Sequence, residues 1–346
     1  MTSEIEAHRG AAKALKKAYL AGEPAARERV RAFVDKLEIR HADILHVIAR
    51  EAGHSSWPKL KHSLELNTLS RDERAERLKI ALHRGWAWMI DEMLAQDPTL
   101  PAHNLGLQIA LYDVDAVNSA LERDRNAATR IIGIRSPILH LAFSRYHKQA
   151  PERAGDIIAI AERLVAAGAD VNDGYPFEPG SEHLLSALYG ALAHANNIPL
   201  ARWLLEHGAS PDDNESLYHS TELGHTEGLK LLLEFNAKTS GTNALPRAID
   251  FNDPEMVRLL LEAGANPDEA VLDHPSGEAM DTIPGLHQAA RRWASAEIAT
   301  LLLDHGANPR GLWHGHTPYA TARIFGNAEI AALLESRGLA TSLDPL

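Results

Sequence analysis

The residue types in this sequence are compatible with one simple kind of catalysis, proton transfer by histidine. The chain contains nineteen histidines and no cysteine, so disulfide bonds, a thiolate nucleophile and cysteine-ligated metal clusters are excluded. The common signatures of nucleotide binding and serine hydrolysis, GxxxxGK[ST], GxGxxG and GxSxG, are absent. An imidazole that titrates near neutrality beside a carboxylate could still move protons, as isomerisation, elimination or cyclisation requires.

Three histidines are candidates for such acid–base chemistry, together with nearby carboxylates. The candidate groups are His183, His219, His274, Glu178, Glu182, Asp273 and Glu278. The nearest approach to a metal-binding pair is His314-Gly315-His316, because alternate residues of an extended segment face the same side. No His-Glu-x-x-His spacing accompanies it. We therefore predict no bound metal and no cofactor.

A repeated helical unit must position these groups, since one phrase recurs along the second half of the chain. It reads LLLEAGAN at 259–266 and LLLDHGAN at 301–308. Each copy is an apolar helix end that stops at a residue tolerant of the left-handed conformation, followed by a small alanine. The predicted helix stops are Gly168, Gly208, Asn236, Gly264, Gly306 and Gly338, at an average interval of 34 residues.

A second phrase starts the preceding helix of each unit. It reads SPILHLA at 136–142, IPGLHQA at 283–289 and HTPYATA at 316–322. Ser or Thr before Pro caps a helix, and Pro at the first helical position loses no hydrogen bond. Between the phrases, GHTE at 224–227 and GNAE at 326–329 indicate a tight turn joining antiparallel helices. Each unit is therefore a helix, a tight turn, a second helix and an extended loop, which we call the finger.

These phrases resemble the T-P-L-H-x-A, G-H-x-E and L-L-L-E-x-G-A-N/D consensus of the ankyrin repeat family, whose period is about 33 residues. The resemblance implies an all-α solenoid of stacked helix–turn–helix repeats with short finger loops. Residues 67–346 would hold about eight repeats, of which the first two, 71–100 and 103–131, are degenerate. It also implies that several histidines are structural, namely His140, His207, His225, His287 and His305.

Residues 1–66 are predicted to form a separate module, with helices over 4–21, 24–37 and 41–52 and a fourth from 57. The segment 48–61 resembles a short module that precedes bacterial ankyrin arrays, so we interpret the chain as an ankyrin repeat protein of bacterial type. The module either caps the open end of the array or docks a partner through basic helix faces. Those faces carry Lys13, Lys16, Lys17, Arg27, Arg29 and Arg31.

Uneven repeat spacing predicts a notch along the finger edge. From a helix stop to the leucine of the next helix start, the distance is 17 and 22 residues in two repeats but 9 in the two between them. Clipped fingers would then lie between the enlarged fingers 171–183 and 268–284. Such a recess suits a small molecule. Insertions and deletions in surface loops without a function would give the same spacing. The predicted binding residues on its walls and floor are Tyr175, Tyr189, Tyr218, His219 and Arg247.

A second predicted binding surface combines arginine and aromatic side chains in the last repeats. Such pairs are enriched in protein hot spots and also bind carboxylates or phosphates, whereas packing and solubility would explain them equally well. The residues are Arg291, Arg292, Trp293, Trp313, His314, His316 and Tyr319.

Charge divides the chain into two parts. Residues 1–66 carry a net charge of +3, and residues 67–346 carry −15, for a total of −12. This balance argues against nucleic acid as a partner, and no apolar window is long enough to span a membrane, so we predict a cytoplasmic protein. The leading hypothesis is a protein-interaction scaffold whose concave acidic groove takes a protein partner, such as a basic segment. One alternative is a small-molecule-binding protein or a cofactor-independent acid–base enzyme that uses the notch. Another is a protein that assembles through its N-terminal module. Whether the chain is an enzyme stays open.

Overall fold

The structure, a computed structural model, describes residues 4–269 and 283–339. The chain forms two compact units. The first comprises Met1–Ile80 and Trp88–Leu100, and the second comprises Ala81–Ala87 and Pro101–Leu346. The repeated phrases and the candidate acid–base residues Glu178, Glu182, His183 and His219 belong to the second unit.

Short helices build the first unit. They are α1 (Glu4–Leu20), α2 (Pro24–Arg31), α3 (His41–Glu51), α4 (Trp57–Leu66), most of α5 (Arg71–Arg84) and α6 (Ala87–Gln96). Gly22 and Gly53, which follow α1 and α3, have positive φ values of 84° and 85°. Trp57, at the start of α4, packs against the apolar core of α1 to α4.

The second helix of this unit is shorter than the sequence predicts. We expected a helix over 24–37, but α2 ends at Arg31. Val34 still enters the core, with 8% of its surface exposed. Beyond Arg31 the backbone turns, with Phe33 N bonded to Val30 O at 3.2 Å, and Lys36 then pairs with Asp43 in the first turn of α3 at 2.6 Å.

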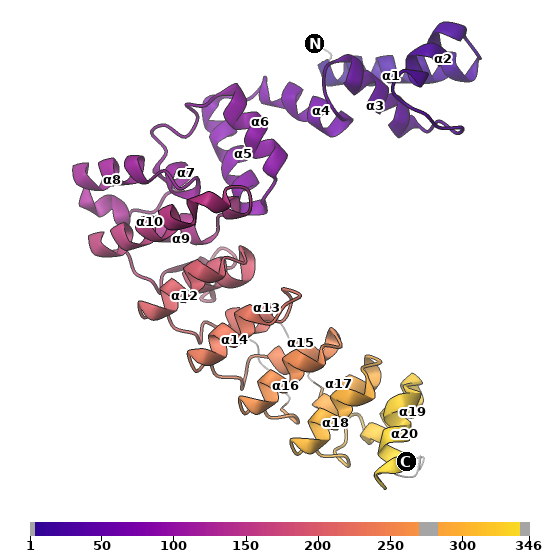
Figure 1. Cartoon of the computed structure of the whole chain (residues 1–346), viewed down its shortest axis with the longest axis vertical. Coiled ribbons are helices and arrows are strands. Elements are labelled where there is room, and N and C mark those ends of the chain that lie inside the picture. The colour runs from indigo at the N-terminus through magenta and orange to yellow at the C-terminus, as the bar shows by residue number, and fades with distance from the viewer. Residues whose placement is uncertain (1–3, 270–282, 340–346) are drawn as a thin grey trace. The chain divides into compact units, whose positions relative to one another are not determined.

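The second unit is a stack of antiparallel helix pairs. The pairs are α7 (Leu105–Ala110) with α8 (Val114–Arg123), α9 (Pro137–Ala142) with α10 (Ala154–Ala167), α11 (Ala187–Tyr189) and η4 (Gly190–His194) with α12 (Ile198–Glu206), α13 (Ser216–Ser220) with α14 (Glu227–Glu234), α15 (Ala244–Asp250) with α16 (Pro254–Glu262), α17 (Gly285–Arg291) with α18 (Ala296–Asp304), and α19 (Pro318–Phe325) with α20 (Ala328–Ser336). Figure 1 shows the later pairs following one another, with α13, α15, α17 and α19 on one side and their partners on the other. The predicted stack of helical repeats is confirmed.

The repeated phrase ends each second helix as predicted. The six predicted stops have φ values of 115° at Gly168, 95° at Gly208, 58° at Asn236, 90° at Gly264, 92° at Gly306 and 67° at Gly338. The residue after the stop then bonds back to the helix, as Ala265 N does to Leu260 O at 2.9 Å. Glycine and asparagine accept this backbone conformation most readily.

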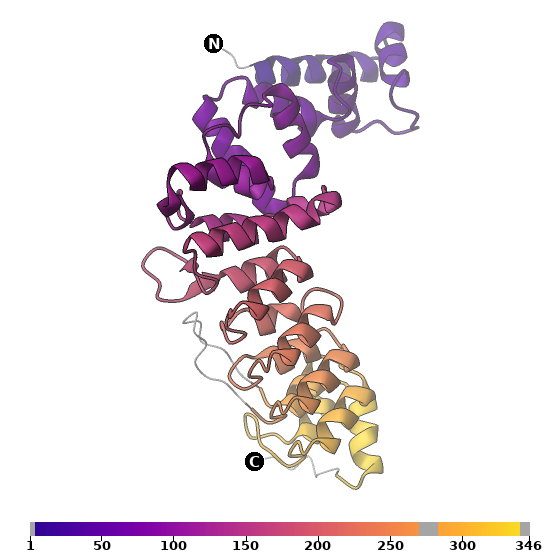
Figure 2. The same cartoon turned by 60° about the vertical axis from the view of Figure 1, so that its left-hand side comes forward.

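One finger forms a β-hairpin, an element that the sequence did not predict. β1 (Gly174–Pro176) pairs antiparallel with β2 (Leu184–Ser186), and Tyr175 lies opposite Leu185. Phe177 donates its N–H to His183 O at 3.0 Å and closes the loop between the strands. Figure 2 shows the hairpin projecting from the side of the helix stack. The hydrogen bonds of the hairpin therefore fix the backbone at His183.

A close contact between Phe143 and Gly190 seats the hairpin repeat on its neighbour. A Cβ atom at residue 190 would lie 2.5 Å from Phe143 Cε2, so only glycine fits there. Phe143 is buried, and its ring meets that of Tyr175 edge-on with centroids 5.2 Å apart. Among the helices that the structure describes, none combines the length and the apolar character needed to cross a membrane.

Candidate functional site

Asp213 joins the hairpin finger to the next finger and to the start of α13. Its Oδ2 accepts hydrogen bonds from the hydroxyls of Ser186 and Ser216, both at 2.6 Å. Its Oδ1 accepts from the backbone N–H groups of Glu215 and Ser216, at 3.0 and 2.7 Å. The carboxylate therefore holds the backbone N–H groups of Glu215 and Ser216, just at the start of α13, and fixes the backbone that carries Glu215.

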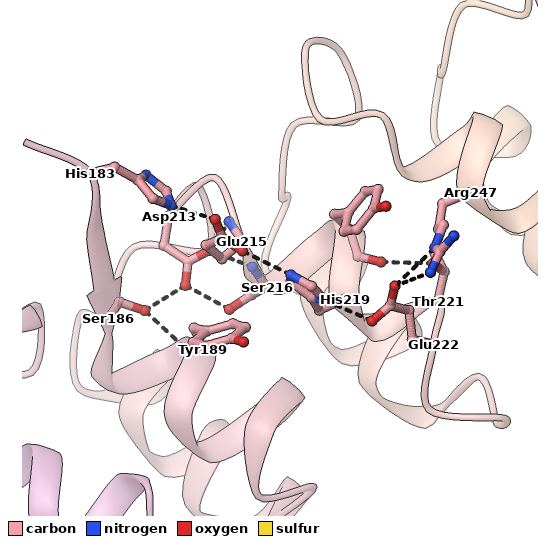
Figure 3. Close-up of polar contacts among 11 residues, drawn as sticks. His183, Ser186, Tyr189, Asp213, Glu215, Ser216, His219, Thr221, Glu222 and Arg247 are labelled. Atoms are coloured by element: carbon pink, nitrogen blue, oxygen red, sulfur yellow. Dashed lines mark hydrogen bonds and ion pairs between the residues drawn. The ribbon is translucent and has the colours of Figure 1, made fainter. Parts of the chain in front are cut away.

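Glu215 is a buried carboxylate between two histidines of different repeats. Its side chain is 9% exposed, and its Oε1 accepts a hydrogen bond from His183 Nε2. Its Oε2 lies 2.9 Å from His219 Nε2, one turn along α13. Figure 3 shows the imidazoles of His183 and His219 on opposite sides of this carboxylate. The arrangement satisfies a charge that would otherwise be costly to bury.

His219 contacts a carboxylate through each of its ring nitrogens. Nε2 faces Glu215, and Nδ1 lies 2.8 Å from Glu222 Oε2. A neutral imidazole carries a single N–H, and an ionised carboxylate only accepts hydrogen bonds. Both contacts form together when His219 is an imidazolium, so the geometry indicates a protonated histidine at this point.

The titration behaviour of the three groups agrees with that assignment. Burial lowers the pKa of His219, but hydrogen bonds with Glu215 and Glu222 outweigh it and raise the pKa above its ordinary value. Burial raises the pKa of Glu215, but hydrogen bonds from His219 and His183 leave it lowered. Burial likewise raises the pKa of Glu222, and hydrogen bonds from His219 and Arg247 lower it further than burial raises it. Two ionised carboxylates therefore hold one imidazolium.

The contacts continue through α15 to α17. Arg247 Nη2 lies 2.6 Å from Glu222 Oε1, and its Nη1 lies 3.8 Å from Asp250 Oδ2. Asp250 Oδ1 then accepts from Arg292 Nε at 2.9 Å. We name these linked side chains the polar row: His183, Glu215, His219, Glu222, Arg247, Asp250 and Arg292. The polar row crosses four consecutive repeats.

A pocket of about 440 Å³ lies between the hairpin finger and the finger that precedes α13. Glu182, His183 and Ser186 line it from the hairpin, and Asp213 and Asn214 line it from the second finger. One end of the polar row therefore opens onto a cavity of the size typical of ligand sites, about 300–1,000 Å³.

The structure brings together some of the predicted acid–base groups. His183 and His219 share Glu215, which the sequence analysis did not single out. Glu182 lines the pocket, and Glu178 is exposed in the hairpin loop. Asp273, His274 and Glu278 lie outside the described residues, as does most of the predicted wall 268–284. The pocket is thus bounded by one enlarged finger and its clipped neighbour.

The three predicted tyrosines have different surroundings. Tyr175 is buried, and its hydroxyl accepts a hydrogen bond from Arg135 Nη2 at 2.9 Å. The ring of Tyr189 lies 5.3 Å from that of His219, centroid to centroid. Arg247 lies over the ring of Tyr218 at 5.6 Å. Tyr189 and Tyr218 therefore flank the polar row, whereas Tyr175 belongs to the core.

The residues of the second predicted surface lie at opposite ends of the first helices of their repeats. Trp313 lies in a finger, and its ring centroid is 6.0 Å from that of His287 near the start of α17. Trp293 instead follows the end of α17 and lies against Gly326. Tyr319 donates its hydroxyl to Glu335 at 2.7 Å. The structure therefore does not gather Arg291, Arg292, Trp293, Trp313, His314, His316 and Tyr319 into one cluster.

Glu215 and Glu222 could have been found from the sequence. They lie four residues before and three residues after His219, and such positions share one face of a helix. Within residues 4–269 and 283–339, no group of three or more His, Asp or Glu side chains is placed to hold a metal ion.

Residues 188–270 match the family described as "Ankyrin repeats (3 copies)". The chain contains an ankyrin repeat domain. This confirms the resemblance drawn from the repeated phrases, over the part that includes α12 to α16 and most of the polar row.

Curated relatives match over a similar region. The human ankyrin repeat and MYND domain-containing protein 1 is 26% identical over 188 residues, and its mouse counterpart is 27% identical over 186. Each match covers 39% of this chain and 20% of the relative, so the chain spans about a fifth of the length of these proteins.

Solved ankyrin domains are also similar. The human ASB11 ankyrin repeat domain has a TM-score of 0.48 at 23% identity and covers 68% of this chain and 97% of its own. An ankyrin repeat domain from Acinetobacter baumannii AYE has a TM-score of 0.45 at 26% identity and covers 58% and 97%. The curated relatives are human and mouse proteins, so the comparisons do not assign a bacterial type to the ankyrin domain.

Proposed function

We propose that this ankyrin domain is a protein-interaction scaffold, and that a basic segment of its partner binds between the fingers 169–186 and 208–215. We call this surface the finger groove. The observation that carries the proposal is the pocket of about 440 Å³ between these two fingers, whose lining includes Glu182 and Asp213. A lysine or arginine side chain fits a cavity of this size and charge.

The charge of the finger groove supports a basic partner. The two fingers contain seven acidic residues and no lysine or arginine: Asp170, Asp173, Glu178, Glu182, Asp212, Asp213 and Glu215. Lys238 of the following finger pairs with Asp212 at 3.4 Å and leaves a clear negative excess. Complementary charge accelerates encounter and suppresses binding of other acidic surfaces.

The polar row supports the groove by holding its two sides in place. His183 of the hairpin finger is tied to Glu215 of the second finger, and Ser186 is tied to Asp213. A groove that is ordered before its partner arrives loses less conformational entropy on binding. The buried ion pairs are therefore positioning contacts in this proposal, and the exposed carboxylates contact the partner.

A labelled lysine-rich peptide of about ten residues, which spans about 30 Å when extended, tests the proposal by fluorescence anisotropy. We expect the double variant Glu178→Gln/Glu182→Gln to bind about three- to tenfold more weakly, with a reduced salt dependence. Glu329→Gln, an exposed change on α20, is the matched control. Equal binding by the double variant and the control would exclude the finger groove.

The contact between Glu215 and His219 favours a second candidate, a small-molecule site or acid–base enzyme. Glu215 links His219 to His183, whose side chain lines the pocket, so this hydrogen-bonded chain of groups can exchange a proton with a ligand bound there. Native mass spectrometry of protein purified from its own host tests this candidate. A small-molecule adduct that disappears in His219→Gln supports it, whereas an adduct retained by the variant excludes this site.

We propose that residues 1–66 cap the array formed by residues 67–346. Terminal repeats need a polar outer surface, and bidentate contacts between Arg29 and Glu51, at 2.9 and 2.8 Å, stabilise the packed helices of this module. Deleting residues 1–66 should then lower the melting temperature and promote aggregation. Unchanged stability with loss of a partner would favour the docking role instead.

A further inference from the structure

Four cations of the second unit gather near the end of α5 and around α9. Arg84 ends α5, Arg135 precedes α9, and Arg145 and Lys148 follow α9. None of the four forms an ion pair with a carboxylate in the part of the chain that the structure describes. This is unusual in a domain where acidic residues outnumber lysine and arginine by fifteen. We name these four residues the cationic cluster.

Two stacked imidazoles lie within the cationic cluster. The rings of His83 and His194 are nearly parallel, with centroids 4.1 Å apart. His194 Nε2 donates to His83 O at 2.9 Å, and Arg145 Nε donates to His194 O at 2.8 Å. His83 Nδ1 is buried and has no hydrogen-bond partner among the described residues. The backbone N–H of Arg145 bonds to Leu82 O at 3.0 Å and fixes this repeat against the end of α5.

Arg135 is held from both sides by aromatic rings. Its guanidinium carbon lies 4.7 Å from the ring centre of Phe143 and 4.6 Å from that of Tyr175. Its Nη2 donates to the Tyr175 hydroxyl, and its Nε is buried without a hydrogen-bond partner in the described structure. A fixed positive charge therefore lies beside the two histidines, and no acidic side chain of residues 4–269 or 283–339 forms an ion pair with it.

The titration of the neighbouring groups reflects this excess of positive charge. Burial and the charges of nearby cations lower the pKa of His83 to about 3 and that of His194 to about 4. Burial and the charge of Arg84 also lower the pKa of Arg145. Burial and the charge of Arg145 lower that of Lys148. The two imidazoles affect each other's pKa, and Arg84, Arg135 and Arg145 affect both. None of these groups is a carboxylate.

We propose that the cationic cluster binds a multivalent oxyanion, namely a phosphate group carried by a small molecule, between Arg84, Arg145 and Lys148. Guanidinium groups match the geometry of phosphate oxygens with paired N–H donors, and lysine adds a compact charge. Arg84 makes no side-chain hydrogen bond with the described residues, and Arg145 uses only its Nε, so donors remain for the ligand. Arg135 contributes a fixed charge from within the fold.

This site is separate from the finger groove in chemistry. The finger groove is acidic and takes a basic segment, whereas the cationic cluster takes an anion. A lysine-rich peptide and a phosphate ligand therefore test the two proposals independently, and the failure of one leaves the other standing.

Calorimetry of the full chain with inorganic phosphate and with pyrophosphate tests the proposal. We expect binding of at least one of them, weakened at least tenfold in Arg145→Gln and in Lys148→Gln. Arg202→Gln is the matched control, because Arg202 already pairs with Glu234 at 2.7 Å. Lys148 is exposed, so its variant carries the test if Arg145→Gln does not fold.

A second readout is the NMR titration of the two imidazoles with and without the anion. An anion beside His83 and His194 should raise the pKa of both by about one unit, since opposite charge favours the protonated form. Tighter binding of pyrophosphate than of phosphate would indicate a diphosphate ligand, and equal binding a single phosphate group. No binding of either anion, equal affinity in both variants and the control, or unmoved imidazole titrations would overturn the proposal.

Discussion

Glu215 accepts a hydrogen bond from His219, one turn further along α13, at 2.9 Å, and the same carboxylate accepts one from His183 in the preceding finger. One buried charge thus ties a helix to the hairpin of the neighbouring repeat. The sequence spacing indicates an enlarged finger followed by a shortened one here, whereas the structure shows a junction between the hairpin and the short helix.

The first prediction concerns the stability of this junction at alkaline pH. The pKa of His219 is raised in the folded chain, so its contribution is fully present below the unfolded pKa of about 6.5 and is lost as pH rises through the folded pKa. Urea unfolding between about pH 6 and pH 9 should show this loss in the native protein and not in His219→Gln. His305→Gln is the control, because among the described residues the His305 ring bonds only to Leu301 O of its own helix, at 2.8 Å. Parallel pH profiles for the native protein and His219→Gln would contradict the imidazolium assignment.

The second prediction concerns the buried charge itself. Glu215→Gln should lower the free energy of unfolding by about 2–4 kcal/mol, because it leaves the His219 imidazolium with one carboxylate and replaces one of the two acceptor oxygens between His183 and His219 with an NH2 donor. Glu178→Gln, on the exposed hairpin loop, should change it by less than about 0.5 kcal/mol. Denaturant titration of both variants at neutral pH measures the difference. Similar stabilities would mean that the junction depends on apolar packing alone.

The third prediction tests the packing of Phe143 on Gly190. Gly190→Ala places a methyl group where Phe143 Cε2 would be 2.5 Å away, so it should cost about 1–3 kcal/mol. Phe143→Leu shortens the opposing side chain and should recover part of that cost in the double variant. Thermal unfolding of the two single variants and the double variant gives the coupling energy. Additive losses would show that the two residues do not meet.

The fourth prediction concerns Trp293, which has a φ of 58° and is 65% exposed. The residues at the same point of the neighbouring repeats are Asn252 and Gly326, with φ values of 52° and 77°. Asparagine tolerates this conformation better than tryptophan, so Trp293→Asn should raise the free energy of unfolding by about 0.5–1 kcal/mol. Calorimetric melting compares the two proteins. A fall of several degrees would mean that the indole contributes more by packing on Gly326 than its backbone costs.

The fifth prediction concerns acid. His83 and His194 have folded pKa values of about 3 and 4, well below the unfolded value. The stability that they contribute is present above about pH 6.5 and is lost as pH falls, because the unfolded chain then binds protons that the folded chain does not. Each imidazole should account for roughly 1–2 kcal/mol by pH 5, allowing for solvent screening. His194→Gln should flatten the urea-unfolding profile between about pH 4 and pH 7, and an unchanged slope would argue against buried neutral imidazoles.

The helix boundaries of the array were predictable because they are set by local chemistry. A left-handed residue must end each second helix, and the sequence places glycine or asparagine at 168, 208, 236, 264, 306 and 338. The start of α19 is equally local, since Thr317 accepts a hydrogen bond from Ala320 N at 3.3 Å and Pro318 follows it. No contact between repeats is needed to read these signals.

The candidate site was predicted only in part because it depends on contacts between repeats. His183 and His219 were identified as acid–base groups, but Glu215, their shared partner, was not. Tyr175 lies at a finger position that suggested exposure, yet Arg135, forty residues earlier, holds it in the core. Residue spacing alone does not show which side chains of adjacent repeats meet.

The short helix α13 also determines how the array would respond to mechanical load. Each helix pair contacts mainly its neighbours, so a pull on the two ends of the array passes through every junction in turn. α13 has only five residues, and Glu215 and Glu222 link it by ion pairs to the repeats before and after it. A hydrogen-bonded ion pair breaks after its two groups have separated by a small distance. We therefore expect stretching to separate the repeats first around α13 and to leave the longer helix pairs after it folded together.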